Sequence, residues 1–173
     1  DALPISKIVM KDELKSHRTR LRLANEIRLH KTLHHPNVVE FEHCFEDKEN
    51  VFIFLELCEN QSLNELIRIR NNFITPEIQS FMFGIVNGVK YIHSQRIIHR
   101  DLKLGNLLLT ENLEIRISDF GLAAKLTHPG ERRKTMCGTP NYIAPEILES
   151  NSFLTQITPT WATPMKLTSG VWV

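Results

Sequence analysis

The first third of the chain alternates short apolar stretches with charged turns, which predicts several strands and one helix. Residues 5–11 predict a strand after Pro4, although proline is poorly suited to a central strand because it has no N–H to donate. Apolar residues spaced among charges predict a helix over residues 18–33, ending at a His-His-Pro-Asn turn. Two stretches rich in β-branched and aromatic residues, 38–45 and 51–57, flank a polar turn and predict a β-hairpin.

Helical periodicity dominates the middle of the chain. A short helix is predicted over residues 62–70. A longer one begins at Thr75, which we expect to be the cap, with Pro76 in its first turn. Its apolar positions keep the i, i+3, i+4 spacing, so one face should be buried. These positions are Ile78, Phe81, Met82, Ile85, Val86, Val89 and Ile92.

Short strands are predicted at residues 107–109 and 114–117, and a long irregular segment follows as far as residue 146. A structureless stretch of this length is uncommon in a compact domain unless it is functional. The order of elements therefore predicts a two-lobed α+β fold with a small strand-rich lobe, a mainly helical lobe and a functional loop.

Composition adds only broad limits. The chain is 42% hydrophobic and 24% charged with a net charge of +1, which favours neither a nucleic-acid nor a membrane-surface partner. No apolar run approaches the roughly 18 residues that a membrane span needs. Cys44, Cys58 and Cys137 lack the spacing of a disulfide or zinc framework, so we expect reduced thiols in the cytoplasm or nucleus.

The candidate chemistry lies in residues 97–109, IIHRDLKLGNLLL, and in the Asp-Phe-Gly tripeptide that follows. Phosphoryl transfer requires a carboxylate that orients the attacking hydroxyl, a cation at the transferred phosphate and ligands for magnesium. Asp101 suits the first role, and Lys103 on the same loop suits the second. Asn106 and Asp119 offer the oxygen ligands that Mg²⁺ prefers.

Each motif alone is weak, because His-Arg-Asp is a common tripeptide and a lone Asp-Phe-Gly is usually a turn. Their combination, with Lys at +2, Asn at +5 and a later Pro-Glu-Ile-Leu, makes coincidence negligible. With these motifs the chain resembles the protein kinase family, and Lys103 favours the Ser/Thr type. The resemblance implies a two-lobed kinase fold, ATP and Mg²⁺ as cofactors, and protein substrates with Ser/Thr acceptors.

The resemblance also implies roles for residues upstream. Lys7, in Lys-Ile-Val-Met-Lys, matches the strand that bears the ATP-anchoring lysine. Glu26, nineteen positions later on the first predicted helix, matches its ion-pair partner. Such a pair holds the lysine against the α- and β-phosphates and ties the position of the helix to activity. An ordinary surface lysine is the alternative for Lys7 taken alone.

The segment that begins at Cys58 matches the hinge between kinase lobes. By this resemblance, Leu55 controls the depth of the adenine pocket, and Glu56 and Cys58 offer backbone hydrogen bonds to the purine. Leu108 closes the pocket from below.

Residues 135–146 match the end of a kinase activation segment, with Thr139 and Glu146 in the part that docks the protein substrate. Thr135 is the candidate phosphorylation site for an upstream activating kinase. A phosphate adds a charge of about −1.5 to −2 and orders a loop by pairing with arginine, for which Arg100 is the natural partner. An unmodified loop threonine is the alternative.

Within the kinases, four stretches are similar to the polo-like group of cell-cycle kinases: LELCENQSL, HRDLKLGNLLL, DFGLAAKL and ERRKTMCGTPNYIAPEIL. His30, four residues after Glu26, matches a polo-like habit where many kinases have an aliphatic residue. The resemblance runs over residues 7–148. It departs at Leu108 and Ser118, which leaves inhibitor preference open.

Nothing that resembles a glycine-rich phosphate loop precedes Lys7. Residues 1–57 are therefore expected to form part of an N-lobe, residues 58–150 part of a C-lobe, and residues 151–173 a tail. The codons of residues 161–173, read in a shifted frame, can encode GHSYEADVWSLG, which resembles the kinase segment expected there. We interpret the tail as frame-shifted, with a divergent genuine terminus as the alternative, and we expect the chain as written to be inactive.

Two other classes of function compete with an active protein kinase. A pseudokinase scaffold is distinguished by loss of the lysine, aspartates or asparagine at positions 7, 101, 106 and 119, and all four residue types are present. A small-molecule phosphotransferase of related fold would lack the GTPNYIAPE segment. We expect no nucleic-acid or membrane partner, and centrosome or spindle association follows from the resemblance alone.

Overall fold

The computed structural model describes residues 4–128, 131 and 137–143. Its strands are β1 (Pro4–Met10), β2 (Phe41–Glu46), β3 (Asn50–Glu56), β4 (Ile97–Ile98), β5 (Leu107–Leu109), β6 (Ile115–Ile117) and β7 (Ala124–Lys125). Its α-helices are α1 (His17–His30), α2 (Leu63–Arg70) and α3 (Thr75–Ser94), and short 3₁₀ helices cover Lys11–Glu13, Leu104–Asn106 and Pro140–Tyr142.

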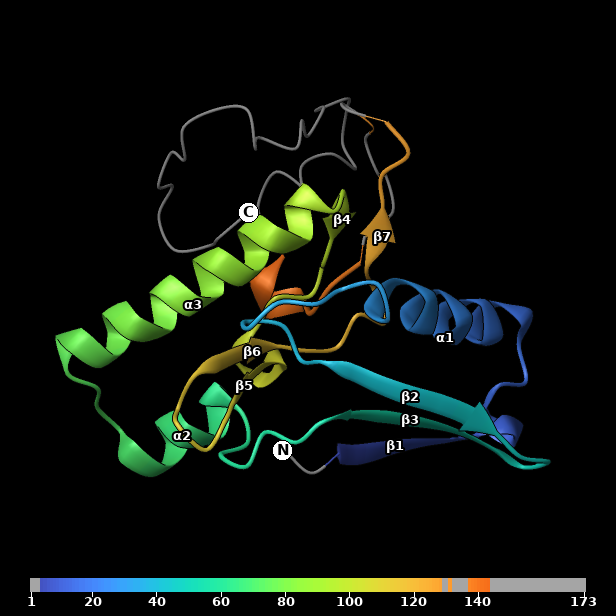
Figure 1. Ribbon diagram of the computed structural model, residues 1–173, viewed down its shortest axis with the longest axis horizontal. Helices are drawn as coiled ribbons and strands as arrows, with labels where there is room; N and C mark the ends of the chain where they lie inside the picture. Colours follow the sequence, from blue (N-terminus) through green and yellow to red (C-terminus); the bar gives the residue numbers. More distant parts are fainter. Residues whose placement is uncertain (1–3, 129–130, 132–136, 144–173) are drawn as a thin grey trace.

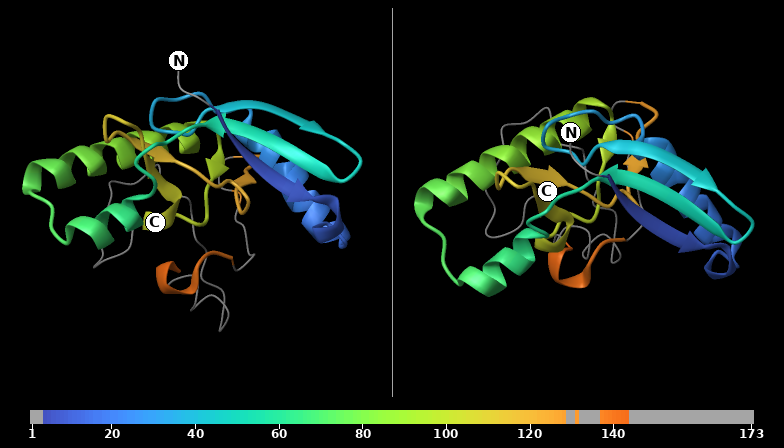
Figure 2. Two further views of the ribbon diagram at one scale, coloured as in Figure 1. Left: turned by 90° about the horizontal axis from the view of Figure 1, so that it is seen from below. Right: turned by 60° about the horizontal axis from the view of Figure 1, so that its bottom comes forward.

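The elements divide into a sheet-containing part and a mainly helical part (Figure 1). Strands β1, β3 and β2 form an antiparallel sheet in that order, and α1 lies beside it. In both views of Figure 2 the sheet and α1 occupy one end of the molecule, and α2 occupies the other. The predicted α+β arrangement is therefore present, and the expected lobe boundary at residue 57 falls in the connection between β3 and α2.

Strand β1 shows why Pro4 is tolerated. Among the described strands, β1 is at the edge of the sheet, and Pro4 is its first residue. Within the described three-stranded sheet, a proline at the first position of an edge strand interrupts no interior ladder.

Helix α1 ends at His30, three residues earlier than predicted. Ser16 caps its start by accepting a hydrogen bond from the Thr19 N–H at 3.0 Å. At the other end the Thr32 hydroxyl donates to the Leu29 carbonyl at 2.7 Å, so a side chain satisfies a carbonyl at the end of the helix. Leu33 is fully buried, but it reaches the core from the turn after the helix.

The prediction that the first hairpin strand begins at residue 38 is also wrong. Val38 and Val39 are 1% exposed and lie outside β2, which begins at Phe41. Val38 forms a parallel bridge with Ile117 of β6, and the Val39 N–H donates to the Ile117 carbonyl at 3.0 Å. These apolar residues are buried because they join the sheet-containing part to β6.

Helix α3 begins at Thr75, so threonine is its first residue and Ile74 occupies the cap position. The carboxylate of Glu77 accepts a hydrogen bond from the Ile74 N–H at 3.0 Å, so a backbone donor at the start of the helix has a partner. The predicted buried face is only partly correct, because Phe81 and Ile92 are buried whereas Ile78 is 48% exposed.

Two glycines account for the actual contact face of α3. Gly84 and Gly88 are buried against β6 and the turn at Asn37. A Cβ at Gly88 would lie 2.7 Å from Cδ1 of Ile117 and 2.8 Å from the Asn37 carbonyl oxygen. The helix can therefore approach β6 this closely only without a side chain at that position.

Replacing Gly88 with alanine should lower the free energy of unfolding by about 1–3 kcal/mol, because the added methyl overpacks a contact made partly with backbone. This is the opposite of the usual gain of about 0.8–1 kcal/mol for alanine over glycine within a helix. Gly105→Ala is the matched control, since a Cβ there meets nothing within 4 Å. Urea unfolding measures both, and a Gly88→Ala protein as stable as the control would contradict the close approach.

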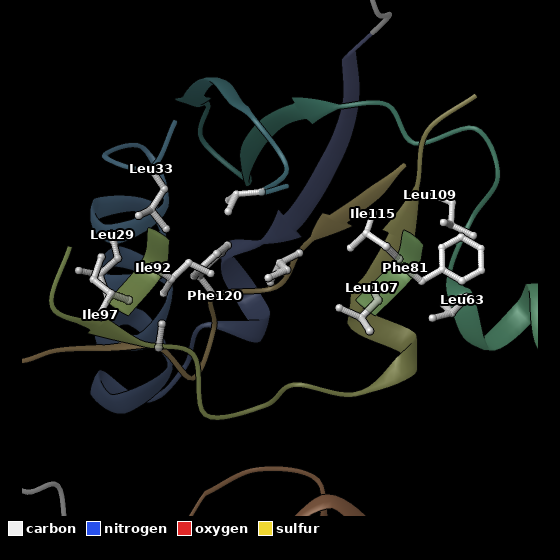
Figure 3. Close-up of a cluster of buried hydrophobic side chains, with 13 residues drawn as sticks. Leu29, Leu33, Leu63, Phe81, Ile92, Ile97, Leu107, Leu109, Ile115 and Phe120 are labelled. Atoms are coloured by element: carbon white, nitrogen blue, oxygen red, sulfur yellow. The ribbon is translucent and has the colours of Figure 1, made fainter. Parts of the chain in front are cut away.

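The core is one cluster to which α1, β5, β6, α3 and α2 all contribute (Figure 3). Phe120, in the loop after β6, is fully buried near Leu29, and Leu63 of α2 lies at the other end. No helix in the described part of the chain has the length and apolar character needed to cross a bilayer.

Candidate active site

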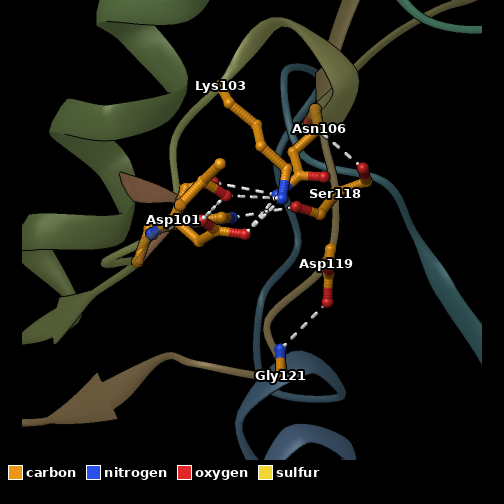
Figure 4. A network of polar contacts seen from close by, with 8 residues as sticks. Asp101, Lys103, Asn106, Ser118, Asp119 and Gly121 are labelled. Carbon is orange, nitrogen blue, oxygen red and sulfur yellow. Dashed lines mark hydrogen bonds and ion pairs between the residues drawn. The ribbon is translucent and has the colours of Figure 1, made fainter. Parts of the chain in front are cut away.

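The β5–β6 hairpin brings two loops of the site together. Leu107 pairs with Ile117, so Asn106 before β5 and Ser118 after β6 are neighbours. The N–H and hydroxyl of Ser118 both donate to the Asn106 carbonyl, at 2.9 and 3.1 Å. Asp119 follows directly, so the candidate catalytic loop, which carries Asp101, Lys103 and Asn106, meets the Asp-Phe-Gly loop at this end of the hairpin (Figure 4).

Asp101 lies at the centre of a polar network and is 8% exposed. Lys103 Nζ lies 2.7 Å from Asp101 Oδ2, and the Thr139 hydroxyl donates to Asp101 Oδ1 at 2.7 Å. Burial opposes ionisation of Asp101, but hydrogen bonds from Lys103, Thr139 and Asn106 and the charge of Lys103 outweigh it and lower the pKa of this carboxyl. Asp101 is therefore an ionised carboxylate at neutral pH.

Thr139 has a contact that the sequence did not predict. The sequence predicts Thr139 only as part of the substrate-docking segment, yet Lys103 Nζ also donates to its hydroxyl oxygen at 2.9 Å. The Thr139 hydroxyl thus bridges two candidate site residues that are distant in sequence. Asp101, the candidate base, is 38 residues away, and Lys103, the candidate phosphate-binding cation, is 36 residues away. Glu146, the other residue assigned to this segment, and Thr135 lie outside the described residues.

Asn106 and Asp119 have oxygen atoms suited to magnesium. Asn106 Nδ2 donates to the Asp101 carbonyl at 2.8 Å and to its Oδ2 at 3.2 Å, so the amide oxygen remains an acceptor. Asp119 Oδ1 accepts the Gly121 N–H at 3.2 Å. No group of three acidic, histidine or cysteine side chains within the described residues can hold a metal alone. Two oxygen ligands fit Mg²⁺, which usually completes its shell with water and phosphate.

Left-handed backbone conformations occur in the same two loops, as they do at Gln61, Asn71, Arg96 and Leu113 elsewhere in the described chain. Arg100 and Asp119 have φ angles of 68° and 63°, in the left-handed region that residues with a Cβ rarely adopt. Such conformations persist where surrounding contacts enforce them, and they cluster at functional sites. Here Arg100 Nε donates to the Leu122 carbonyl at 2.7 Å and ties the catalytic loop to the Asp-Phe-Gly loop.

His99 holds the loop that carries Asp101 through hydrogen bonds of its ring, a role that the sequence did not predict. Its Nε2 lies 2.8 Å from the Ser118 carbonyl, and its Nδ1 accepts the Asp101 N–H at 3.3 Å. Because a carbonyl can only accept, Nε2 carries the proton. Burial lowers the pKa of His99, so the ring is neutral.

Lys7 and Glu26 form the expected ion pair. Lys7 Nζ of β1 lies 2.8 Å from Glu26 Oε1 of α1. The pair adjoins the Asp-Phe-Gly loop, because a Cβ at Gly121 would lie 3.3 Å from Glu26 Oε2 and 3.1 Å from Asp119 Oδ1. The absence of a side chain at Gly121 therefore leaves room for both carboxylates.

At the predicted hinge, the structure limits the backbone hydrogen bonds that Glu56 can make with a purine. Its N–H donates to the Glu40 carbonyl at 3.0 Å, so only its backbone carbonyl remains for a purine. The Glu56 carboxylate accepts a hydrogen bond from Arg116 Nε at 2.9 Å. The two side chains of this ion pair are only 14–15% exposed. The sequence did not predict this pair. The pattern of charged residues along the sequence cannot predict an ion pair between residues that are sixty positions apart.

The other residues assigned to the adenine pocket lie near this point. Leu55 is half-buried on β3 and pairs with Ile5 and Phe41 of the neighbouring strands. Leu108 is half-buried on β5 and bridges to Ser62. Burial, and then the charge of Glu56, raise the pKa of the Cys58 thiol to about 12, so it is uncharged.

Comparisons with known proteins agree with these motifs. The family model described as the protein kinase domain matches residues 3–168. The chain is 54% identical over 156 residues to a probable serine/threonine-protein kinase, CCRP1, of Zea mays, which covers 90% of this chain and 25% of that protein. It is 52% identical over 143 residues to the cell cycle serine/threonine-protein kinase CDC5/MSD2 of Saccharomyces cerevisiae, covering 83% of this chain and 20% of that protein.

A third relative is the serine/threonine-protein kinase polo of Drosophila melanogaster, 51% identical over 142 residues, with 82% of this chain and 25% of that protein covered. The chain thus spans a quarter or less of the length of these relatives. The similarity to polo-like kinases predicted from the motifs is confirmed. The chain belongs to the protein kinase domain family.

Proposed function

We propose that the protein containing this chain is an ATP-dependent protein kinase that transfers the γ-phosphoryl group to Ser or Thr of protein substrates. The observation that carries the proposal is the ionised Asp101, held by Lys103, Thr139 and Asn106 at the meeting point of the two loops. Phosphoryl transfer depends mainly on the positioning of the reacting groups and on nearby charges. These contacts fix the Asp101 carboxylate in place and set the Lys103 ammonium beside it.

In this proposal each side chain has a separate task. Asp101 orients the acceptor hydroxyl and takes its proton, since its charge leaves it able to accept one. Lys103 places a positive charge beside the transferred group, and Lys7, held by Glu26, binds the phosphates of ATP. Asn106 and Asp119 would hold Mg²⁺. Bound magnesium neutralises charge on the phosphates.

The proposal is tested with the full-length protein, ATP labelled in its γ-phosphate and casein as acceptor. Acid hydrolysis of the labelled casein should release phosphoserine or phosphothreonine and no phosphotyrosine. Phosphotyrosine as the main product would contradict the proposed acceptor class, and label without any phosphoamino acid would contradict transfer to hydroxyl side chains.

We further propose that phosphorylation of Thr135 by an upstream kinase activates the protein. A cleft of about 510 Å³ lies between α1 and the Asp-Phe-Gly loop, and Arg18, Arg22 and Arg100 are among the residues that line it. None of the three has an acidic partner among the described residues. A phosphate offers such arginines a bidentate, doubly charged acceptor.

Thr135→Ala should therefore lower activity, and Thr135→Asp should partly mimic the active state. Arg100→Ala should abolish the difference between the two, because the added charge then loses its partner. Arg20→Ala is the control, since Arg20 is exposed on α1 and does not line the cleft. Initial rates with casein measure all variants. If every variant matches the wild type, Thr135 is not the switch.

A further inference from the structure

Helix α1 carries an unusually large share of the positive charge of the chain. Four of the 21 lysines and arginines lie between His17 and His30, but only one of the 20 acidic residues does. That residue, Glu26, is paired with Lys7. The rest of the chain therefore has a small excess of acidic residues, whereas α1 is locally basic.

Part of this charge lies on the side of α1 that faces solvent. Arg20, Ala24 and Arg28 follow one another at intervals of four residues, so they share one face of the helix. All three are exposed, and Leu21, which lies beside them, is 56% exposed. We call these four residues the outer stripe of α1. Arg20 and Arg28 do not line the cleft between α1 and the Asp-Phe-Gly loop, so binding of phosphorylated Thr135 there does not account for them.

A solvated helix face is the simpler explanation of such a stripe. Charged helix faces are usually stabilised by acidic and basic residues three or four positions apart. No carboxylate in the described part of the chain pairs with Arg20 or Arg28, and Arg28 donates to the neutral side-chain oxygen of Asn25, at 3.0 Å. The first turn of α1 holds Arg20 but no acidic residue, although the helix dipole favours acids there. The outer stripe thus adds unbalanced charge to the helix, which a solvated face alone does not explain.

The outer stripe has the chemistry that complements an acidic protein segment. Arg20 and Arg28 lie about 6 Å before and after Ala24 along the helix axis. A guanidinium group binds a carboxylate through two parallel hydrogen bonds. The short side chain of Ala24 leaves room for another chain to approach the helix, and the exposed Leu21 offers it an apolar contact. A segment with carboxylates on both sides of an apolar residue therefore matches the stripe in charge and in shape.

We propose that the outer stripe of α1 docks an acidic segment of a partner protein, whose carboxylates pair with Arg20 and Arg28 and whose apolar side chain packs on Leu21 and Ala24. The acidic excess of the rest of the chain disfavours nucleic acid and anionic membranes, because these polyanions contact a wider surface than one helix face. Docking at this surface does not depend on phosphoryl transfer, because no residue of the outer stripe takes part in the proposed mechanism. The two proposals can therefore fail separately.

The test measures binding of a fluorescein-labelled amphipathic peptide of glutamate, leucine and alanine to the full-length protein by fluorescence anisotropy. Ala24→Glu places a carboxylate between the two arginines, where it pairs with them and repels the acidic peptide, so binding should weaken at least about tenfold. Ala24→Gln has nearly the same shape without the charge and should bind within about twofold of the wild type. Gln79→Glu adds the same charge at an exposed position of α3 and should also bind within about twofold.

A thermal melt separates loss of docking from loss of the fold. Glutamate at position 24 is four residues from Arg20 and from Arg28, a spacing at which acidic and basic residues stabilise a helix. Ala24→Glu should therefore melt at a temperature no lower than the wild type. Should it lack a cooperative melt, Arg28→Glu takes its place, and the same loss of at least about tenfold in peptide affinity is expected.

Several outcomes would overturn docking of an acidic segment. These are no binding of the acidic peptide by the wild type, or equal affinities of the wild type and Ala24→Glu. Equal losses in Ala24→Glu and Ala24→Gln would also overturn it, because the loss would then not come from charge. The same variants are compared with phosphatidylserine vesicles and with a labelled single-stranded oligonucleotide. Binding of either one that Ala24→Glu abolishes, without binding of the peptide, would replace the protein partner by a lipid surface or a nucleic acid.

Discussion

Replacing Asp101 with asparagine should lower the turnover number about 10³-fold, while the affinity for nucleotide stays within about twofold. Asparagine has nearly the shape of aspartate, so its one side-chain oxygen can still accept from the Thr139 hydroxyl, and Asn106 keeps its hydrogen bond to the backbone carbonyl of residue 101. It cannot accept the proton of the attacking hydroxyl, and it leaves Lys103 Nζ without the carboxylate 2.7 Å away. The loss should therefore fall on the chemical step.

Steady-state rates with casein and mant-ADP titrations separate the two effects for Asp101. Asp12→Asn is the matched control, because Asp12 is an exposed residue of a 3₁₀ helix and is remote in sequence from the catalytic loop. It should leave both turnover and affinity unchanged. Near-normal turnover in Asp101→Asn would remove Asp101 from the mechanism.

Replacing Lys7 with methionine should lower kcat/KM for ATP by about 10²–10³-fold, comparable to the loss of one fixed electrostatic contact in other active sites. Methionine has a similar length but no charge for the phosphates. It also leaves the Glu26 carboxylate, whose side chain is 13% exposed, without its partner 2.8 Å away. An unpaired acid beside the nucleotide phosphates would repel them.

Lys11→Met is a close control for this substitution. Lys11 follows β1 directly, but its ammonium contacts the Glu46 carboxylate and the Asp47 carbonyl at the far end of the sheet. Its loss should change kcat/KM for ATP by less than about twofold, since exposed ion pairs contribute little. Equal losses in the two variants, measured from initial rates over a range of ATP concentrations, would show that Lys7 has no special role.

Local sequence patterns predicted the elements whose contacts are local. The strands Leu107–Leu109 and Ile115–Ile117 and the helix capped by Ser62 lie where turn residues and apolar periodicity placed them. The predictions failed where distant residues decide the conformation. Val38 joins β6 and not β2, and α3 packs through Gly88, which carries no hydrophobic signal.

The same distinction holds for the site. The motifs predicted which residue types gather around Asp101, because their spacing within one loop is characteristic. They did not predict that the Thr139 hydroxyl bridges Asp101 and Lys103, that His99 carries its proton on Nε2, or that Arg116 binds Glu56. These contacts depend on packing between segments, which spacing along the chain does not encode.

The most direct test of a Ser/Thr protein kinase is transfer of labelled γ-phosphate by the full-length protein to two acceptors, casein and a small polyol such as glycerol, with Mg²⁺ present. Labelled casein, unlabelled glycerol and loss of the signal in Asp101→Asn are the results that the ionised Asp101 predicts. Label on glycerol but not on casein would indicate a small-molecule phosphotransferase. No transfer to either acceptor, by protein that still binds ATP, would indicate a scaffold and contradict the proposed catalytic function.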